Sequence, residues 1–179
     1  MSSNRFIRAA GIAGIVATLC TIGISFTIDQ TTYAPNSPLY GLFAIASGVA
    51  GIVLAIGLYS LYRPTAAAPS MIAVIVSVLG YSLFLLTYFS ASKPGDTVVV
   101  AADLLANILG VALFSWLAYR TRMLPRALAF VGWFAAASGA AMYLVSVSSG
   151  ANSTNPDNPL NGLVTALYLA YFVLLLMWY

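Results

Sequence analysis

Six long apolar stretches, separated by short breaks that are polar or contain proline, make up most of this 179-residue sequence. Each stretch has 19 to 24 residues. As an α-helix, each would cover about 30 Å, which is the thickness of the hydrocarbon core of a bilayer. The sequence therefore predicts six transmembrane helices. Their predicted bounds are Phe6–Ile28, Leu39–Tyr62, Met71–Phe89, Val98–Tyr119, Ala127–Val147 and Leu160–Tyr179.

A helical bundle is the fold class that fits these stretches. The backbone finds no water to bond inside a bilayer, so a spanning segment is either a helix or a strand of a closed barrel. Barrel strands alternate between polar and apolar residues, and these stretches do not. A composition of 61% hydrophobic and 6% charged residues also excludes a soluble domain. We expect one all-α domain over residues 1–179, with the six helices arranged as three hairpins.

The basic residues predict the orientation of this bundle, because loops rich in arginine and lysine face the cytoplasm. Six of the seven basic residues fall on one side of the predicted membrane. We therefore expect a multi-pass protein of the cell membrane with an uncleaved first helix and both termini in the cytoplasm. Anionic lipid is the expected polar partner, and no basic patch is left for nucleic acid. The six residues are Arg5, Arg8, Arg63, Arg120, Arg122 and Arg126, and the seventh is Lys93.

The first and last pairs of spans resemble each other at a constant offset of 121 residues. This offset aligns Leu39–Leu42 with Leu160–Leu163, and the prolines before each stretch also coincide. We expect the first and last hairpins to be related repeats. Because each hairpin contains two spans, such copies keep the same orientation, and their symmetry axis would run along the membrane normal.

The repeated outer loops have a simple interpretation as helix starts. Ser37 and Asn158 can accept hydrogen bonds from the first free amides of the following helices. Pro38 and Pro159 would then take the first helical position, where a missing amide hydrogen costs nothing. The alternative is a shared surface for a ligand or partner. Asn152 opens an N-glycosylation sequon in the last outer loop, which matters only in a host that glycosylates.

Small residues recur four positions apart along several of the spans. This spacing lets two helix backbones approach closely, and close packing stabilises helix pairs in lipid, where the hydrophobic effect does not drive association. We expect these contacts to lie within one chain, and the alternative is an interface between copies. The glycines predicted to pack helices are Gly14, Gly48, Gly51, Gly132 and Gly139.

One carboxylate lies well inside a predicted span. Asp103 is about six residues into the fourth span, and Asn107 follows one turn deeper on the same face, with Gly110 next on that stripe. A carboxylate in lipid is costly and marks a candidate functional site that faces the bundle interior. Asp103 and Asn107 are therefore candidates for a ligand or ion pathway. The alternative is structural, with a neutral or hydrogen-bonded Asp103 joining helices through Ser, Thr or Tyr hydroxyls.

The residues that are missing from the sequence exclude most catalysis. Without His and Glu there is no imidazole ligand for haem or a transition metal, no Ser-His-Asp triad and no pair of carboxylates in one span. The single cysteine, Cys20, cannot form an intrachain disulfide. We expect no enzyme activity, no metal site and no cofactor.

Four short motifs carry a resemblance to known proteins. They are Arg-Ala-Ala-Gly at Arg8–Gly11, Ala-Asp-Leu-Leu at Ala102–Leu105, Leu-Ala-Tyr-Arg at Leu117–Arg120, and the longer stretch Leu124–Gly132. In these motifs the chain resembles a family of small uncharacterised prokaryotic multi-span membrane proteins. The resemblance covers the first helix and the fourth and fifth spans. It implies a prokaryotic membrane origin and supplies no catalytic residues.

Two functional classes agree with the sequence. The first is a noncatalytic accessory or scaffold subunit of a membrane complex, which contacts other membrane protein subunits and holds a lipid or pigment between its helices. The second is a small-solute transporter or channel that uses the polar stripe of the fourth span. The first is favoured, because transporters normally have several intramembrane polar groups or broken helices and only one polar stripe is visible.

Overall fold

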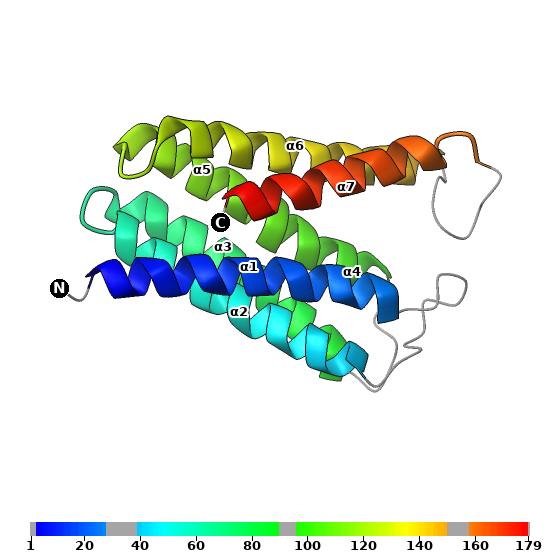
Figure 1. Ribbon diagram of the computed structural model, residues 1–179, viewed down its shortest axis with the longest axis horizontal. Helices are drawn as coiled ribbons and strands as arrows, with labels where there is room; N and C mark the ends of the chain where they lie inside the picture. The colour runs from blue at the N-terminus through cyan, green and yellow to red at the C-terminus, as the bar shows by residue number, and fades with distance from the viewer. Residues whose placement is uncertain (1–2, 28–38, 90–95, 150–157, 179) are drawn as a thin grey trace.

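The computed structural model describes residues 3–27, 39–89, 96–149 and 158–178, and within these ranges the regular structure is entirely helical (Figure 1). The predicted all-α class is confirmed for this part of the chain. The helices are α1 (Ser3–Thr27), α2 (Leu39–Tyr62), α3 (Ala67–Phe89), α4 (Asp96–Asp103), the π-helix η1 (Leu104–Leu109), α5 (Gly110–Thr121), α6 (Arg126–Ser149) and α7 (Asn161–Trp178).

Five helical segments in the described residues are long and apolar enough to cross a membrane, as in a multi-pass membrane protein. They comprise α2, α3, α6, α7 and the continuous run Val100–Thr121, which joins the end of α4 to η1 and α5. In α1 the apolar part, Arg8–Ile24, is shorter. The first predicted span, Phe6–Ile28, extends beyond the described side chains of α1, Arg8–Ile24, at both ends.

Several helix ends differ from the prediction. Helix α3 starts at Ala67 rather than Met71, because Pro69 is tolerated in a first turn that needs no amide hydrogen. The Oδ1 of Asn158 accepts a hydrogen bond from the amide of Leu160 at 2.9 Å, but that amide lies in the turn before α7 and not in the helix itself. The expectation that Pro159 opens the helix is wrong, because Pro159 and Leu160 form a turn before α7 begins. Ser37, Pro38, Lys93 and Asn152 lie outside the described ranges, as do the predicted span ends Ile28 and Tyr179.

Helices that follow one another in the sequence pack side by side. Helix α1 lies along α2, α2 along α3, α5 along α6, and α6 along α7. The run of α4, η1 and α5 contacts both α3 and α6, and α1 touches α7 across the bundle. Figure 1 shows α6 and α7 adjacent on one side and α1 and α2 on the other. The run that contains Asp103 is therefore held between α3 and α6.

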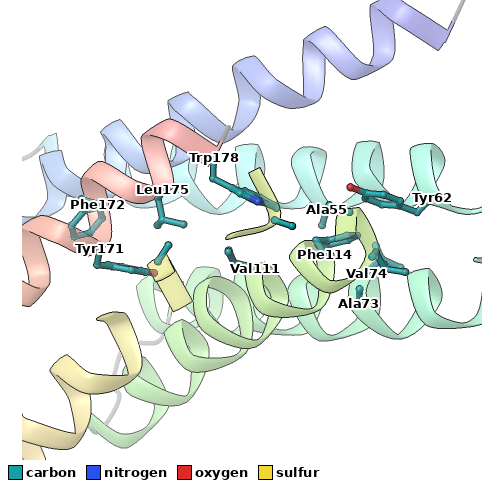
Figure 2. Packing of buried hydrophobic residues seen from close by; sticks show 14 residues of the cluster. Ala55, Tyr62, Ala73, Val74, Val111, Phe114, Tyr171, Phe172, Leu175 and Trp178 are labelled. Atoms are coloured by element: carbon teal, nitrogen blue, oxygen red, sulfur yellow. The ribbon is translucent and has the colours of Figure 1, made fainter. Parts of the chain in front are cut away.

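Aromatic and small side chains fill the core (Figure 2). Tyr62 of α2 stacks on Phe114 of α5 with ring centroids 6.2 Å apart, and both are buried. Trp178, at the end of α7, packs against Gly132 of α6. Large apolar side chains also cover the outer surface, as in Leu144, which is 71% exposed. A surface of this kind suits lipid and not water.

The five glycines predicted to pack helices are all buried. At Gly132 an added Cβ would meet the indole of Trp178, and at Gly139 it would meet Ile108 at 3.2 Å. At Gly48 it would come within 2.6 Å of Leu85. These neighbours belong to the same chain. A further glycine that the sequence did not single out, Gly80, makes the closest approach to a helix backbone, as described below.

Candidate functional site

The candidate site begins where the fourth helical run changes its winding. Helix α4 ends at Asp103, and the next six residues, Leu104–Leu109, form the π-helix η1, in which the amide of Gly110 bonds the carbonyl of Leu105. A single π-helical turn inside an α-helix rotates the residues that follow it, and such turns recur at functional sites. Asn107 lies in this turn and Asp103 directly precedes it.

Gly80 allows α3 to lie directly against the junction of α4 and η1. A Cβ at Gly80 would collide with the backbone nitrogen of Ala106 and would lie 2.8 Å from the carbonyl oxygen of Ala102. Both atoms are main chain, so neither can rotate away as a side chain can. The missing Cβ therefore brings α3 within reach of the polar residues on α4 and η1.

Both oxygens of the Asp103 carboxylate accept hydrogen bonds from neighbouring residues. Asn107 Nδ2 donates to Oδ1 at 2.5 Å, and the hydroxyl of Tyr143 on α6 donates to Oδ2 at 2.7 Å. The hydroxyl of Tyr81 on α3 donates to Asn107 Oδ1 at 2.9 Å. Bonds to a carboxylate are stronger than those between neutral groups. The cluster of Tyr81, Asp103, Asn107 and Tyr143 thus joins α3, α4, η1 and α6.

Burial of Tyr81 fixes one end of this cluster. Its side chain is 5% exposed, and its ring fills the space that a Cβ at Gly51 of α2 would occupy. Because the ring is held by α2, the hydroxyl is directed toward η1. Gly51, predicted from spacing to be a packing residue, therefore also positions a polar group of the candidate site.

A second polar cluster joins α1 to α2. The hydroxyls of Thr21 and Ser47 lie 2.8 Å apart, and Ser47 Oγ is also 3.2 Å from the carbonyl oxygen of Ala17. Thr18, one turn earlier on α1, donates to the carbonyl of Gly14 at 3.1 Å. Thr18 and Ser47 are each 3% exposed. These hydrogen bonds satisfy polar groups that would otherwise be costly in the bundle interior.

A small cavity of about 10 Å³ separates the two clusters. Its polar lining comes from Thr18 and Thr21 on one side and from Tyr81 and Asn107 on the other. Space of this size holds about one water molecule, and a water there would find several polar partners. Its apolar lining comes from Ala17, Phe172 and Leu175. The geometry therefore offers hydrogen-bonding sites for one small polar molecule beside Asn107.

The structure brings Asp103 and Asn107 together, as their spacing predicts. Gly110, expected on the same stripe, instead faces α3, where an added Cβ would collide with Ser77 Oγ. Sequence reasoning missed Tyr81 and Tyr143. Tyr81 had one signal, its place near the middle of its span, away from the interfacial belts in which tyrosine usually lies. Among the described residues, no three His, Cys, Asp or Glu side chains gather as metal ligands would.

Comparison with known proteins adds no further constraint on the site. No protein-family model, no curated protein and no solved structure matches the chain. What the geometry itself establishes is a helical protein with several segments apolar enough to span a membrane and a hydrogen-bonded carboxylate inside one of them.

Proposed function

We propose that the protein is a noncatalytic integral membrane protein that acts as an accessory or scaffold subunit of a membrane complex. The observation that carries this proposal is the use of both Asp103 oxygens in bonds to Asn107 and Tyr143. A carboxylate engaged in this way joins helices, which is the structural role considered for it above. The absence of His and Glu from the sequence also supports a role without catalysis.

The proposed partners are lipid and other membrane protein subunits. Large apolar side chains such as Phe134 and Leu144 are more than half exposed, and they suit contact with either acyl chains or a neighbouring helix. A lipid or pigment held between helices is part of the same proposal. No nucleic acid, metal or cofactor is proposed.

Co-purification tests this function. We expect the tagged protein, extracted from its native membrane in a mild detergent, to elute with a stoichiometric protein partner or an extractable lipophilic molecule. An unrelated tagged membrane protein, prepared in parallel, controls for adventitious binding. Elution of the protein alone, with the same lipids as the control, would contradict the proposal.

The proposed architecture has six transmembrane helices in three hairpins, with the first and last hairpins related as repeats, and both termini lie in the cytoplasm. The side-by-side packing of α1 with α2 and of α6 with α7 supports this arrangement. In Figure 1 the start of α1, the turn before α3 and the turn before α6 lie at one end of the bundle. The arginines of these segments therefore share one end of the bundle. By the positive-inside rule, that end faces the cytoplasm when the protein lies in a cell membrane.

Cysteine labelling tests the orientation. In a Cys20→Ala background, we expect a membrane-impermeant maleimide to label Asn155→Cys in intact cells and Ser3→Cys only after permeabilisation, because the N-terminal arginines should stay in the cytoplasm. Cys20→Ala without a new cysteine is the control for background labelling. Labelling of Ser3→Cys from outside intact cells would contradict the proposed topology.

A small-solute transporter or channel is the second candidate function. The observation that favours it is the π-helical turn directly after Asp103, because transporters place substrate and ion sites at breaks in their helices. In this second candidate function, the cavity of about 10 Å³ beside Asn107 is part of the solute path. Solute flux into reconstituted vesicles separates the two functions, since only a transporter would lose flux in Asp103→Asn.

A further inference from the structure

The turn between α5 and α6 carries three arginines that are exposed at one end of the bundle. Arg120 lies in the last turn of α5, Arg122 follows that helix, and Arg126 opens α6. Because the segments before and after the turn are both long and apolar enough to cross a membrane, the turn lies at the membrane surface. This location places three guanidinium groups at the level of lipid headgroups.

Two of these guanidinium groups are stacked on aromatic rings. The guanidinium carbon of Arg120 lies 5.1 Å from the centre of the Trp116 ring, and that of Arg126 lies 5.5 Å from the centre of the Tyr119 ring. Stacking uses the face of a guanidinium and leaves the N–H groups at its edge free to bond. The two arginines are thus held in place with their donors available.

The aromatic cluster beneath them extends onto α6. Tyr119 lies against Trp133 at 5.4 Å and against Phe130 at 5.9 Å between ring centres, and Phe130 is 46% exposed. Aromatic rings of this kind sit at the boundary between headgroups and acyl chains. The surface therefore has cationic groups at the depth of the lipid phosphates and apolar rings at the depth of the upper acyl chains.

Among the side chains that the structure describes, the charge on the turn has no acidic counterpart nearby. Asp103 is the one acidic residue whose side chain the structure describes, and it is bound to Asn107 and Tyr143. Among the described residues, no hydrogen bond or ion pair involves the guanidinium of Arg120, Arg122 or Arg126. The backbone conformation also favours a compact turn, because Arg122 takes a left-handed conformation with φ of 56° and its amide bonds the carbonyl of Ala118.

We infer that this turn binds the phosphate headgroup of an anionic phospholipid. Arg120 and Arg126 hold the phosphate through the edges of their stacked guanidinium groups, Arg122 adds positive charge, and the aromatic cluster contacts the upper acyl chains. Arginine forms paired hydrogen bonds with phosphate oxygens, and a membrane supplies such a ligand at this depth. The inference holds for either orientation of the bundle and does not depend on the proposed accessory function.

Tryptophan fluorescence offers a local probe of the site, because Trp116 and Trp133 lie on the two helices that flank the turn and belong to its ring contacts. The full-length protein would be reconstituted in vesicles of phosphatidylcholine. One sample contains added phosphatidylglycerol with brominated acyl chains, and the other contains the same amount of brominated phosphatidylcholine. Brominated chains quench tryptophan on contact. We expect stronger quenching by the brominated phosphatidylglycerol. Removal of each arginine of this turn should weaken the preference roughly fivefold, as expected for one basic group at a lipid surface.

The decisive variant is Arg120→Gln with Arg126→Gln, and Arg122→Gln provides a second variant that breaks no ring contact. Arg63→Gln is the matched control, because Arg63 also stacks on a ring, that of Tyr59 at 5.9 Å, at another turn of the bundle. Arg63→Gln should keep the preference, while the double variant should lose it with its helical content unchanged.

Equal quenching by the two lipids in the unmodified protein would overturn the inference. A preference for phosphatidylglycerol that survives in the double variant would also overturn the inference. A preference that is lost in Arg63→Gln to the same extent as in the double variant would overturn it as well. Inorganic phosphate should reduce the preference no more than sodium chloride of the same ionic strength does. A loss caused by phosphate alone would overturn the lipid assignment in favour of a soluble phosphate ligand.

Discussion

Replacing Gly80 by alanine should destabilise the protein by about 2–3 kcal/mol, the upper part of the range for overpacking a tight contact. The new methyl group would collide with the backbone nitrogen of Ala106 and crowd the carbonyl oxygen of Ala102, 2.8 Å away. Relief requires α3 to move away from η1, and this movement would also break the bond from Tyr81 to Asn107. Thermal unfolding in detergent measures the effect.

Two further glycines provide matched controls for this substitution. Gly162→Ala should change stability by no more than about 0.5 kcal/mol, because the added methyl would meet no described atom within 4 Å apart from its chain neighbours and the backbone of its own helix. Gly48→Ala should fall between the two, since its neighbour is the Leu85 side chain, whose end can shift. Equal melting temperatures for Gly80→Ala and Gly162→Ala would show that α3 does not pack tightly against η1.

Replacing Asp103 by leucine should lower stability by about 1–3 kcal/mol in total, because partly buried donors lose their acceptor. Two donors are affected, the amide of Asn107 and the hydroxyl of Tyr143. Asp103→Asn should cost much less, because its oxygen can accept from Asn107 while its amide donates to the Tyr143 oxygen. Chemical or thermal unfolding of both variants in one detergent gives the comparison.

A double-mutant cycle tests whether Tyr143 is a hydrogen-bond partner of Asp103. Asp103→Leu combined with Tyr143→Phe should cost clearly less than the sum of the two single substitutions, because the hydroxyl that one leaves unpaired is removed by the other. Additive losses would argue against a bond between the two side chains. If Asp103→Leu leaves stability, flux and ligand retention all unchanged, Asp103 has no role inside the bundle. Its side chain then lies at the lipid-facing surface and extends to the outer membrane interface.

These substitutions also bear on the choice between the two candidate functions. A scaffold needs the cluster only to hold α3, η1 and α6 together, so Asp103→Asn should leave its association with partners intact. A transporter needs the carboxylate itself, so the same change should abolish flux while the fold survives. The conservative and disruptive variants at one position therefore separate a structural role from a transport role.

The sequence by itself determined the helical class and most of the helix positions. In hydrocarbon each backbone amide must bond within its own segment, so an apolar stretch of 20 or so residues has one common solution. It also determined that Asp103 and Asn107 would meet, since residues four apart share one face of a helix. The arginine-rich turns and the bond from Asn158 to a nearby amide were visible for the same reason, because each depends on neighbours along the chain.

Only the tertiary structure decided which faces of the helices meet. Lipid and the bundle interior are both apolar, so a membrane helix need not carry the polar stripe that would show which side turns inward. The pairing of Tyr81 and Tyr143 with the site and the close approach at Gly80 arise from contacts between different helices. The π-helical turn at Leu104–Leu109 likewise became visible only in the structure. They depend on the fit of individual side chains, which no local pattern records.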